Sequence, residues 1–472
     1  MPDTQRSDNN DNRDNASRFS VDTRVQPVVE QVRQAAHPLT GEWSDFDPLM
    51  KMIDDARYVL IGEASHGTHE FYRTRALITR RLIVEQGFSA VCVEADWPDA
   101  YRINRYVRGE GDGETSLDAL AGFERFPTWM WRNTVVLDFV GWLRQHNEDS
   151  NPARRKVGFY GLDLYSLYTS IDAVLHYLDT VDPAAAALAR ERYACFEHFG
   201  TDAQTYGLLS GYTQGDSCED AVVKQLAEVQ RHALDYARRD GLLAEDEYFF
   251  AEQNAQAVKD AEEYYRTMYH GRLNTWNLRD RHMADTLDAL VKHLDRTRGE
   301  PTKVVVWAHN SHLGDARATE MGRNGELNLG QLVRERHGDQ TRLIGQTTYT
   351  GTVTAANDWD EPARRMRVRP GMTGSYELLF HLVGAPSFLL TLRDQGDALA
   401  GLREPRMERA IGVIYKPDTE RYSHYLYAQL PSQFDAVLHC DETRALEPLD
   451  GASHWETPAE QEETPETYPS AL

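Results

Sequence analysis

The chain alternates between short runs of apolar residues and longer stretches in which apolar residues recur every three or four positions. Several short runs are nearly continuous in apolar residues, which is typical of parallel β-strands buried on both faces. The longer stretches, for instance 72–86, place their apolar residues on roughly one side of a helix. This alternation predicts an α/β fold with a mostly parallel sheet flanked by helices. The candidate strands are 57–62, 88–95, 156–163, 302–310, 341–349, 387–392, 410–416 and 434–442.

Three parts of the chain depart from this alternation. The stretch at about 168–297 is long, charged and nearly free of strand patterns, so we expect a large helical insertion between the third and fourth strands. Residues 1–20 and 455–472 are polar and acidic, and we expect both to form disordered tails. The sequence therefore predicts one large α/β domain at 21–454.

The charge of the chain excludes some classes of partner. The 472 residues carry a formal net charge of −24, from 75 acidic against 51 basic side chains. Nucleic acids and anionic membranes attract basic surfaces, so we expect neither as a partner; a neutral or cationic small molecule is compatible with the charge. No apolar stretch is long enough for a membrane span, and the polar start has no secretory signal. We expect a cytoplasmic protein, with its oligomeric state left open.

The four cysteines are widely spaced, with no C-x-x-C pair. This spacing favours buried or incidental thiols in a reducing compartment over a disulfide framework.

Ionisable residues follow four of the predicted strands. In an open α/β sheet, ligands bind in the crevice beyond the carboxyl ends of the strands. We therefore expect these side chains to meet at one pocket. They are Glu63 and His66; Glu94, Asp96 and Asp99; Asp163, Tyr165 and Ser166; and His309, His312 and Asp315.

His66 is the candidate general base, because an imidazole can take a proton from water near neutral pH. Glu63, three residues earlier, could fix its tautomer. The alternative is that His66 caps the following helix. Arg73 and Arg75 in that helix could hold an oxyanion or a substrate oxygen, or could simply be solvated. Glu94 could orient such an arginine or serve as the acid of the site.

Other hydrolytic motifs are weak or missing from the sequence. No G-x-S-x-G elbow occurs, so a serine-esterase mechanism has little support, and no H-E-x-x-H occurs. Two H-x-x-H pairs do occur, His66 with His69 and His309 with His312. Together with the two glutamates named above, they could bind a divalent metal, so a metal-dependent hydrolase remains an alternative.

A set of ordered motifs between about residues 57 and 450 resembles the erythromycin esterase family. The resemblance implies an α/β fold with a deep cleft and added helices. It also implies hydrolysis of an ester or lactone by activated water, with macrolide opening as the best-known reaction. The motifs are LIGEASHGTHEFYRTRALITRRLI, AVCVEADWPDAYRINRYVRG, WNLRDRHMADTL, VVVWAHNSHLGD, LNLGQLVRERHG and GVIYKPDTERYSHYLYAQLPSQFDAVLHCDETRALEPL.

The resemblance also assigns roles to individual positions. It implies a small-molecule ester or lactone as substrate and no cofactor, with a divalent metal as the open alternative. It gives no role to His69 and Glu70, and a non-catalytic small-molecule-binding or stress-associated protein of the same fold stays possible. The implied site residues are the general base His66, the acid Glu63, the helix arginine Arg75, the strand-end acid Glu94, and His309 and His312 for substrate or oxyanion contacts.

Overall fold

The computed structural model of the protein describes most of the chain. The tails expected at 1–20 and 455–472 lie outside the described residues, so their order stays a prediction. The described residues are 25–110, 115–149, 156–199, 203–210, 218–232, 242–269 and 275–450.

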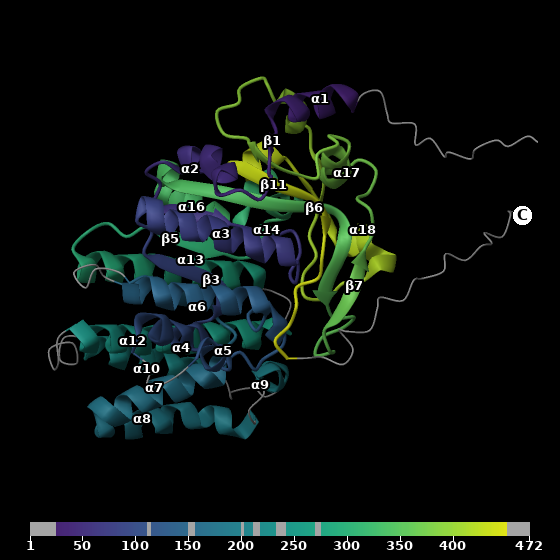
Figure 1. Ribbon diagram of the computed structural model, residues 1–472. Coiled ribbons are helices and arrows are strands. Elements are labelled where there is room, and N and C mark those ends of the chain that lie inside the picture. The colour runs from purple at the N-terminus through teal and green to yellow at the C-terminus, as the bar shows by residue number, and fades with distance from the viewer. Residues whose placement is uncertain are drawn as a thin grey trace, which may run out of the picture.

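A nine-stranded sheet forms the centre of the molecule, in the order β1-β8-β11-β6-β2-β5-β3-β4, with β7 paired to β6 off this path (Figure 1). Every pair from β11 to β4 is parallel, while β8, β1 and β7 pair antiparallel to their neighbours. The predicted fold class, a mostly parallel sheet flanked by helices, is confirmed. The strands are β1 (His37–Pro38), β2 (Tyr58–Ile61), β3 (Ala90–Asp96), β4 (Gly158–Asp163), β5 (Val304–Trp307), β6 (Thr341–Ala355), β7 (Arg364–Val368), β8 (Ser387–Thr391) and β11 (Ala436–Thr443).

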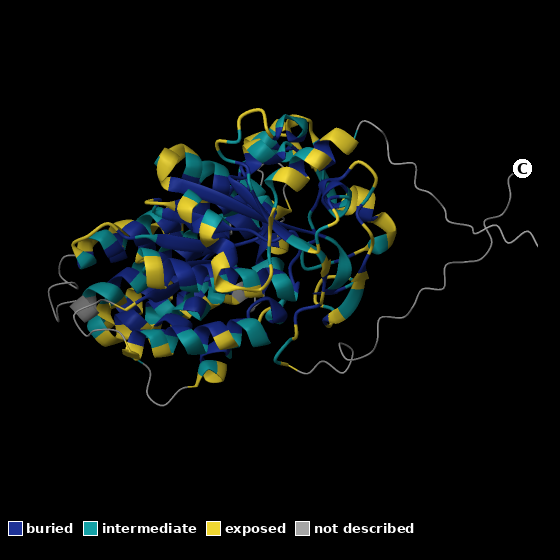
Figure 2. Ribbon diagram, turned by 45° about the horizontal axis from the view of Figure 1, so that its top comes forward, coloured by how far each residue is buried: buried dark blue, intermediate teal, exposed yellow. Residues whose placement is uncertain are grey.

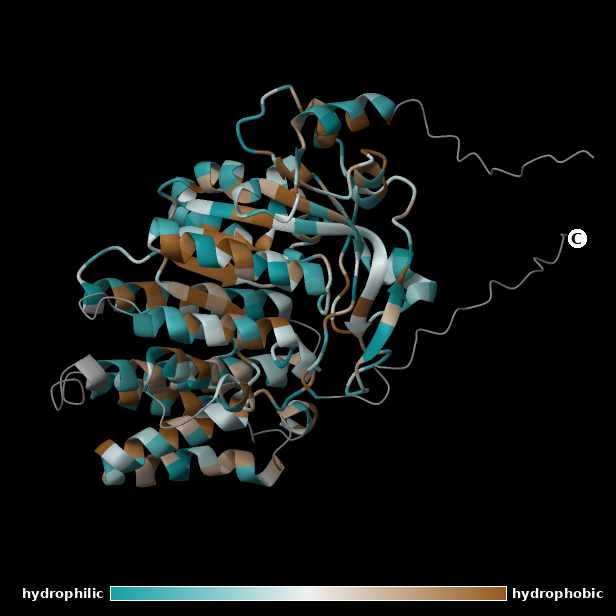
Figure 3. Cartoon of the chain, viewed as in Figure 1, coloured by the Kyte–Doolittle hydropathy of each residue, from teal (hydrophilic) through white to brown (hydrophobic). Residues whose placement is uncertain are grey.

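Helices cover both faces of the sheet, and the residues of β2 show how the two cores form. Val59 and Ile61 point into the core shared with α2, α3, α4 and α6, whereas Tyr58 and Leu60 point into the core shared with α1, α13, α16 and α17. Successive side chains of a strand point to opposite faces of the sheet. A strand that is buried on both faces, such as β2, therefore needs apolar residues at consecutive positions. The central strands are accordingly buried in Figure 2, while the helices in Figure 3 have mixed hydrophilic and hydrophobic surfaces. The helices of this part are α1 (Gln26–Ala35), α2 (Asp47–Ile53), α3 (His69–Gln86), α4 (Trp97–Arg108), α5 (Ser116–Leu120), α6 (Thr134–Asp149), α13 (Thr275–Arg298), α14 (Asn310–Leu313), α15 (Glu320–Arg323), α16 (Leu329–His337), α17 (Tyr376–His381), α18 (Glu420–Ser423) and α19 (Leu430–Gln433).

The helical insertion has a hydrophobic core of its own and lies at the β4 side of the molecule, opposite α1 (Figure 1). The last helix of the stretch expected as an insertion, α13, packs on the sheet: Met283 and Leu287 share a core with Val306 of β5. The helices of the insertion are α7 (Leu167–Val181), α8 (Pro183–Tyr193), α9 (Ala203–Ser210), α10 (Glu219–Arg231) and α12 (Leu242–Met268).

The run at 410–416 is a correction to the predicted strands. It makes isolated bridges, Ile411 to Ser65 and Ile414 to Ala356, and forms no regular strand. Its apolar pattern reflects burial, since Ile411 and Tyr415 are fully enclosed in a small separate core. Beside it lies a two-stranded sheet that the sequence did not predict, made of β9 (Arg406–Arg409) and β10 (Tyr425–Ala428).

The expectation of buried or incidental thiols is wrong for two of the four cysteines. Cys195 and Cys218 form a disulfide within the insertion, across 23 residues of chain, while Cys92 and Cys440 are free. The packing of the insertion brings these two residues together. No short cysteine motif in the sequence therefore predicts the pair. Separately, no helix among the described ranges combines the length and the apolar character needed to cross a membrane.

Candidate active site

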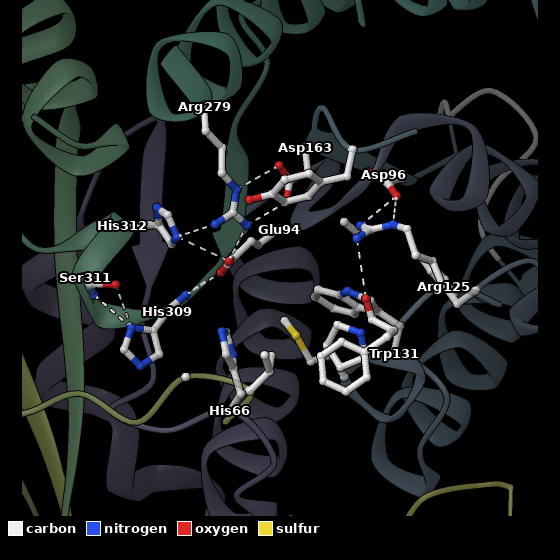
Figure 4. Close-up of a pocket in the computed structure, with 18 of the residues that line it drawn as sticks. His66, Glu94, Asp96, Arg125, Trp131, Asp163, Arg279, His309, Ser311 and His312 are labelled. Carbon is white, nitrogen blue, oxygen red and sulfur yellow. Dashed lines mark hydrogen bonds and ion pairs between the residues drawn. The ribbon is translucent and has the colours of Figure 1, made fainter. Parts of the chain in front are cut away.

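A cavity of about 310 Å³ opens at the carboxyl ends of β2, β3, β4 and β5 (Figure 4). Four of the six predicted catalytic residues line it, namely His66, Glu94, His309 and His312. Other parts of its wall come from the 123–131 segment, from α13 and from the 410–413 part of the apolar run described above. The convergence expected of the strand ends is therefore present, although Glu63 and Arg75 lie behind the cavity wall.

The backbone after β2 turns sharply to present His66. Gly67 has a φ of 73°, and a Cβ at this position would fall 2.0 Å from the carbonyl oxygen of Thr354, so the turn requires glycine. The backbone N–H of His66 donates to the carbonyl of Ile411, which fixes the turn from the other side. The N-cap of α3 is Thr68, so the alternative of His66 as a helix cap does not hold.

His66 is held by Glu63 in the arrangement expected of an oriented base. The Nδ1 atom of His66 lies 2.9 Å from Oε1 of Glu63, and Oε2 of Glu63 forms an ion pair with Nη2 of Arg75 at 3.0 Å. A carboxylate held by an arginine accepts hydrogen bonds, so Nδ1 carries the proton and donates it to Glu63. The Nε2 atom of this tautomer is left as a proton acceptor.

Arg75 does not take the direct role expected for it. Its side chain is buried, with the guanidinium 4.2 Å from the ring centre of Tyr72 and 5.3 Å from that of Trp307, and it does not line the cavity. The cause is the orientation of α3, which turns this face of the helix into the core beneath Glu63. An oxyanion contact from Arg75 does not fit this position, whereas support of the Glu63 carboxylate does. Arg73 is exposed on the same helix.

Glu94 organises the opposite wall of the cavity. Its Oε2 accepts the backbone N–H of His309 at 2.9 Å, and its Oε1 pairs with Nη2 of Arg279 at 2.8 Å. Burial by itself raises the pKa of Glu94, but the charges of His312 and Arg279 outweigh it and hold that pKa well below its usual range. A carboxyl group that stays ionised cannot donate a proton, so the geometry favours the orienting role of Glu94 over the role of acid.

Arg279 of α13 is a site residue that the sequence reasoning missed. It pairs with Asp163 at 2.6 Å and 2.9 Å, lies over the ring of Tyr165 at 4.9 Å and lines the cavity. Figure 4 shows Glu94 between His66 on one side and Arg279 on the other. An arginine in a charged helix is usually solvated, so the spacing of Arg279 in the sequence did not predict that it lines a cavity. The one feature of the sequence that could have indicated Arg279 is its position in the WNLRDRHMADTL motif.

The two histidines of the second H-x-x-H pair have opposite charge states. Burial and the neighbouring His66 lower the pKa of His309 to about 3, so this ring is neutral. Burial alone would lower the pKa of His312, but Asp280 and Glu94 raise it to about 9. His312 is therefore a cation near neutral pH, with its Nδ1 3.0 Å from Asp280 and its ring stacked on Trp276 at 4.3 Å.

The contacts of His309 indicate which of its ring nitrogens carries the proton. Its Nδ1 accepts the backbone N–H of Ser311 at 3.2 Å and lies 2.8 Å from the hydroxyl of the same residue. The proton of the neutral ring is therefore on Nε2, and a hydrogen bond with the backbone of Ala64 also acts on this ring. The ring centres of His309 and His66 are 4.9 Å apart, so this donor is next to the candidate base.

The first H-x-x-H pair does not converge. Glu70 accepts the backbone N–H of Arg444 at 2.8 Å, and His69 lies 2.6 Å from the guanidinium of the same residue. Both side chains hold the C-terminal segment against α3 and do not line the cavity. Within the described ranges, no group of three or more His, Cys, Asp or Glu side chains is placed to hold a metal ion.

Two further strand-end residues lie away from the cavity. Asp315 pairs with Arg317 and Arg334, and the hydroxyl of Ser166 lies 2.9 Å from that of Ser170. Both contacts hold neighbouring backbone segments in place.

Comparison with known proteins places the chain in a family. The model of the erythromycin esterase family matches residues 83–443, and the chain belongs to this family. Erythromycin esterase type II of Escherichia coli is 25% identical over 434 residues, which cover 87% of this chain and 95% of that protein. A putative hydrolase of Bacillus subtilis, YbfO, is 23% identical over 432 residues, which cover 87% of this chain and 89% of that protein. Membership supports hydrolase activity of the esterase type.

Solved structures show the same fold. A Bacillus cereus protein superposes with a TM-score of 0.73 at 20% identity, covering 90% of this chain and 99% of that one. A mutant of the erythromycin esterase EreC in its open conformation superposes with a TM-score of 0.63 at 18% identity, covering 87% and 96% of the two chains.

Proposed function

We propose that the protein hydrolyses a carboxylic ester or lactone with a water molecule that His66 activates. The observation that carries the proposal is the 2.9 Å contact from Nδ1 of His66 to a buried carboxylate, Glu63, while the same ring lines the cavity. This contact fixes the tautomer in which Nε2 accepts a proton. A base positioned in this way accelerates a reaction by about 10²–10⁴-fold.

The reaction consists of two proton transfers around one addition. Nε2 of His66 takes a proton from water while the water oxygen attacks the carbonyl carbon, and the carbonyl oxygen becomes negatively charged. When the tetrahedral intermediate collapses, the bond to the alkoxide breaks and His66 returns its proton to the alkoxide oxygen. The products are a carboxylic acid and an alcohol, which stay joined in one molecule when the substrate is a lactone.

The far wall of the cavity supplies the positive charge that the intermediate needs. Arg279 and protonated His312 both line the cavity, beyond Glu94 as seen from His66. Preorganised donors of this kind stabilise a developing oxyanion more strongly than water does. Glu94 and Asp163 hold Arg279 in place.

A serine nucleophile is less consistent with these contacts. Ser311 lines the cavity and its hydroxyl lies 2.8 Å from Nδ1 of His309, which resembles a nucleophile and its base. However, a histidine whose pKa is lowered to about 3 is a weak base, and its Nδ1 is already occupied by a backbone N–H. These contacts favour direct attack by water.

The test is a screen of wild type and His66→Ala on a panel of esters, lactones and macrolides. We expect wild type to turn over at least one compound and His66→Ala to lower kcat at least about 100-fold with an unchanged unfolding temperature. His176→Ala, at an exposed histidine of α7, is the matched control and should keep its activity. Near-normal hydrolysis by His66→Ala would exclude the proposed base. No turnover together with tight small-molecule binding would support the non-catalytic alternative.

A further inference from the structure

Asn310 of α14 is a buried residue beside the cavity that the proposed reaction does not use. It is 1% exposed and does not line the cavity. Its backbone N–H donates to the carbonyl of Glu63 at 2.8 Å. Its side-chain Nδ2 donates to the carbonyl of Gln346 at 2.9 Å and to Oε1 of Glu408 at 3.3 Å. One asparagine therefore joins the backbone of Glu63 to two other segments of the chain.

The backbone just before Glu63 is shaped to accept Asn310. A Cβ at Gly62 would fall 2.2 Å from Oδ1 of Asn310, so only glycine leaves room for this side chain. Gln346 of β6 completes the contact, because its Nε2 donates to the carbonyl of Gly62 at 2.7 Å. The segment that carries Glu63 is thus held by two buried amide side chains.

Glu408 connects the same hydrogen bonds to His66 from the other side. It lies on β9, which leads directly into the apolar run that closes one side of the cavity. In that run the carbonyl of Ile411 accepts the backbone N–H of His66 at 3.0 Å, and the N–H of Ile411 donates back to the same turn at 2.8 Å. The contacts form a closed ring, from Glu63 to Asn310, to Glu408 and along the chain to His66.

The surroundings of Glu408 favour its neutral form. Its carboxyl group is buried and hydrogen-bonds the amides of Gln433 and Asn310, while Glu377 of α17 places a second carboxyl group nearby. Tyr376 of α17 also faces it, but the hydroxyl of this tyrosine donates to a backbone carbonyl at 3.1 Å. Burial and repulsion by Glu377 raise the pKa of Glu408 to about 8, although the two amides oppose this increase.

The neighbouring cations have other partners. Arg406 pairs with Glu404 at 3.7 Å, and Arg409 pairs with Glu420 at 3.0 Å. The residue of β10 opposite Glu408 is an uncharged leucine. Within the described part of the chain, no ion pair forms with the carboxyl group of Glu408. A buried carboxylate without a cation is costly, so the proton is retained near neutral pH.

We propose that Asn310 and Glu408 are positioning residues for Glu63 and His66, and that Glu408 acts in its neutral form. Neither side chain lines the cavity, so both act through the residues that they hold. Ionised Glu408 places a buried charge opposite Glu377, which opposes the packing of β9 on α17 and loosens the ring. The inference rests on the proposed function, because the residues that are positioned are the proposed base and its carboxylate.

The first test compares Asn310→Ala with Asn147→Ala on an ester that wild type hydrolyses. Asn147 is the matched control, because it is a buried asparagine of α6 whose Nδ2 also donates twice, at 2.9 Å and 2.9 Å, away from the cavity. We expect Asn310→Ala to lower kcat at least about tenfold with KM within about twofold, and Asn147→Ala to keep both. Equal losses of kcat would overturn the positioning role. Asn310→Ser gives the same readout if Asn310→Ala does not fold.

The second test follows the unfolding temperature and kcat of wild type and Glu408→Gln from pH 5 to pH 9. Glutamine is a permanently neutral substitute, whereas wild type loses stability between about pH 4.5 and about pH 8, where only the unfolded chain is ionised at this position. We therefore expect the unfolding temperature of the variant to rise relative to wild type by at least about 2 °C between pH 5 and pH 8. The ratio of kcat at pH 9 to kcat at pH 7 should be at least about threefold higher in the variant. Glu404→Gln, at an exposed acid of the same segment, is the control and should follow wild type. Unfolding temperatures that stay parallel would overturn the neutral form of Glu408.

Failure of this inference differs from failure of the proposed reaction. If no ester is hydrolysed, the proton NMR signal of Nδ1–H of His66, identified by its loss in His66→Gln, replaces kcat as the readout. A shift of this signal in Asn310→Ala but not in Asn147→Ala then supports the positioning role while the reaction is wrong. If His66→Ala loses turnover but Asn310→Ala keeps the kcat of wild type, the reaction stands and the positioning role is wrong.

Discussion

His309 and His312 lie three residues apart and differ in charge because of their contacts. His309 is buried beside His66, and its pKa is lowered to about 3. His312 is equally buried but faces Asp280 and Glu94, and its pKa is raised to about 9. The motif H-x-x-H specifies neither state. One ring is therefore neutral and the other is a cation, a difference that only the three-dimensional contacts determine.

The raised pKa of His312 makes stability depend on pH in a defined direction. A histidine whose pKa rises from 6.5 to about 9 on folding stabilises the protein fully below pH 6.5, and this stabilisation is lost as the pH rises through about 9. We expect it to contribute roughly 2–4 kcal/mol to the free energy of unfolding at pH 6. Urea unfolding of wild type and His312→Gln between pH 6 and pH 10 measures it. A difference between the two proteins that stays constant across this range would contradict the assignment.

At this scale the sequence predicted residue types better than residue roles. Strand-end position was sufficient to find Glu63, His66, Glu94 and the later histidine pair. It was not sufficient for Arg75, because spacing along α3 does not say which face of the helix is turned into the core. It missed Arg279, whose partners Glu94 and Asp163 are 185 and 116 residues away in sequence.

Among the elements, the turn between β2 and α3 determines the position of His66, the proposed base. Gly67 has positive φ and its backbone passes against Thr354 of β6, while the N–H of His66 donates to the 410–416 run. The apolar pattern of that run predicted a strand, but the run crosses the strand ends and closes one side of the cavity. The pattern of apolar residues predicts burial well. It cannot distinguish a strand that is hydrogen-bonded within the sheet from a buried segment that crosses the ends of the strands.

A matched pair of glycine variants tests the turn. Gly67 and Gly87 both have a φ of 73°, but a Cβ added at Gly67 would meet neighbouring atoms within 4 Å, whereas one added at Gly87 would meet none. We expect Gly87→Ala to lower the free energy of unfolding by about 1–2 kcal/mol through backbone strain alone. Gly67→Ala should cost roughly 1–3 kcal/mol more through the clash and should also lower kcat, because His66 shifts. Thermal unfolding and turnover assays measure both, and equal effects of the two variants would contradict this account.

Taken as a whole, the molecule combines a sheet-centred fold with a cavity lined by both acidic and basic side chains. The alternation of strands and helices predicted the sheet and its flanking helices. It did not predict that α13 leaves the insertion and packs on the sheet, because both parts have the same amphipathic pattern. The disulfide between Cys195 and Cys218 was missed for a related reason, since the packing of helices sets which distant residues meet.

Whether the reaction needs a metal ion depends on how all the carboxylates of the site are paired. The strand-end carboxylates are already paired, Glu63 with His66 and Arg75, and Glu94 with Arg279. We therefore expect dialysis against a chelator to leave kcat within about twofold, with metal content followed by elemental analysis. Loss of activity that a stoichiometric divalent metal restores would support the metal-dependent alternative instead.

The most direct test of the account is a double-mutant cycle on kcat with Glu63→Gln, His66→Ala and the two combined. If Glu63 acts only by orienting His66, the substitutions are not additive, and the double variant should be within about threefold of His66→Ala. Losses that multiply, or a His66→Ala variant within about tenfold of wild type, would contradict the claim that this pair is the base of the reaction.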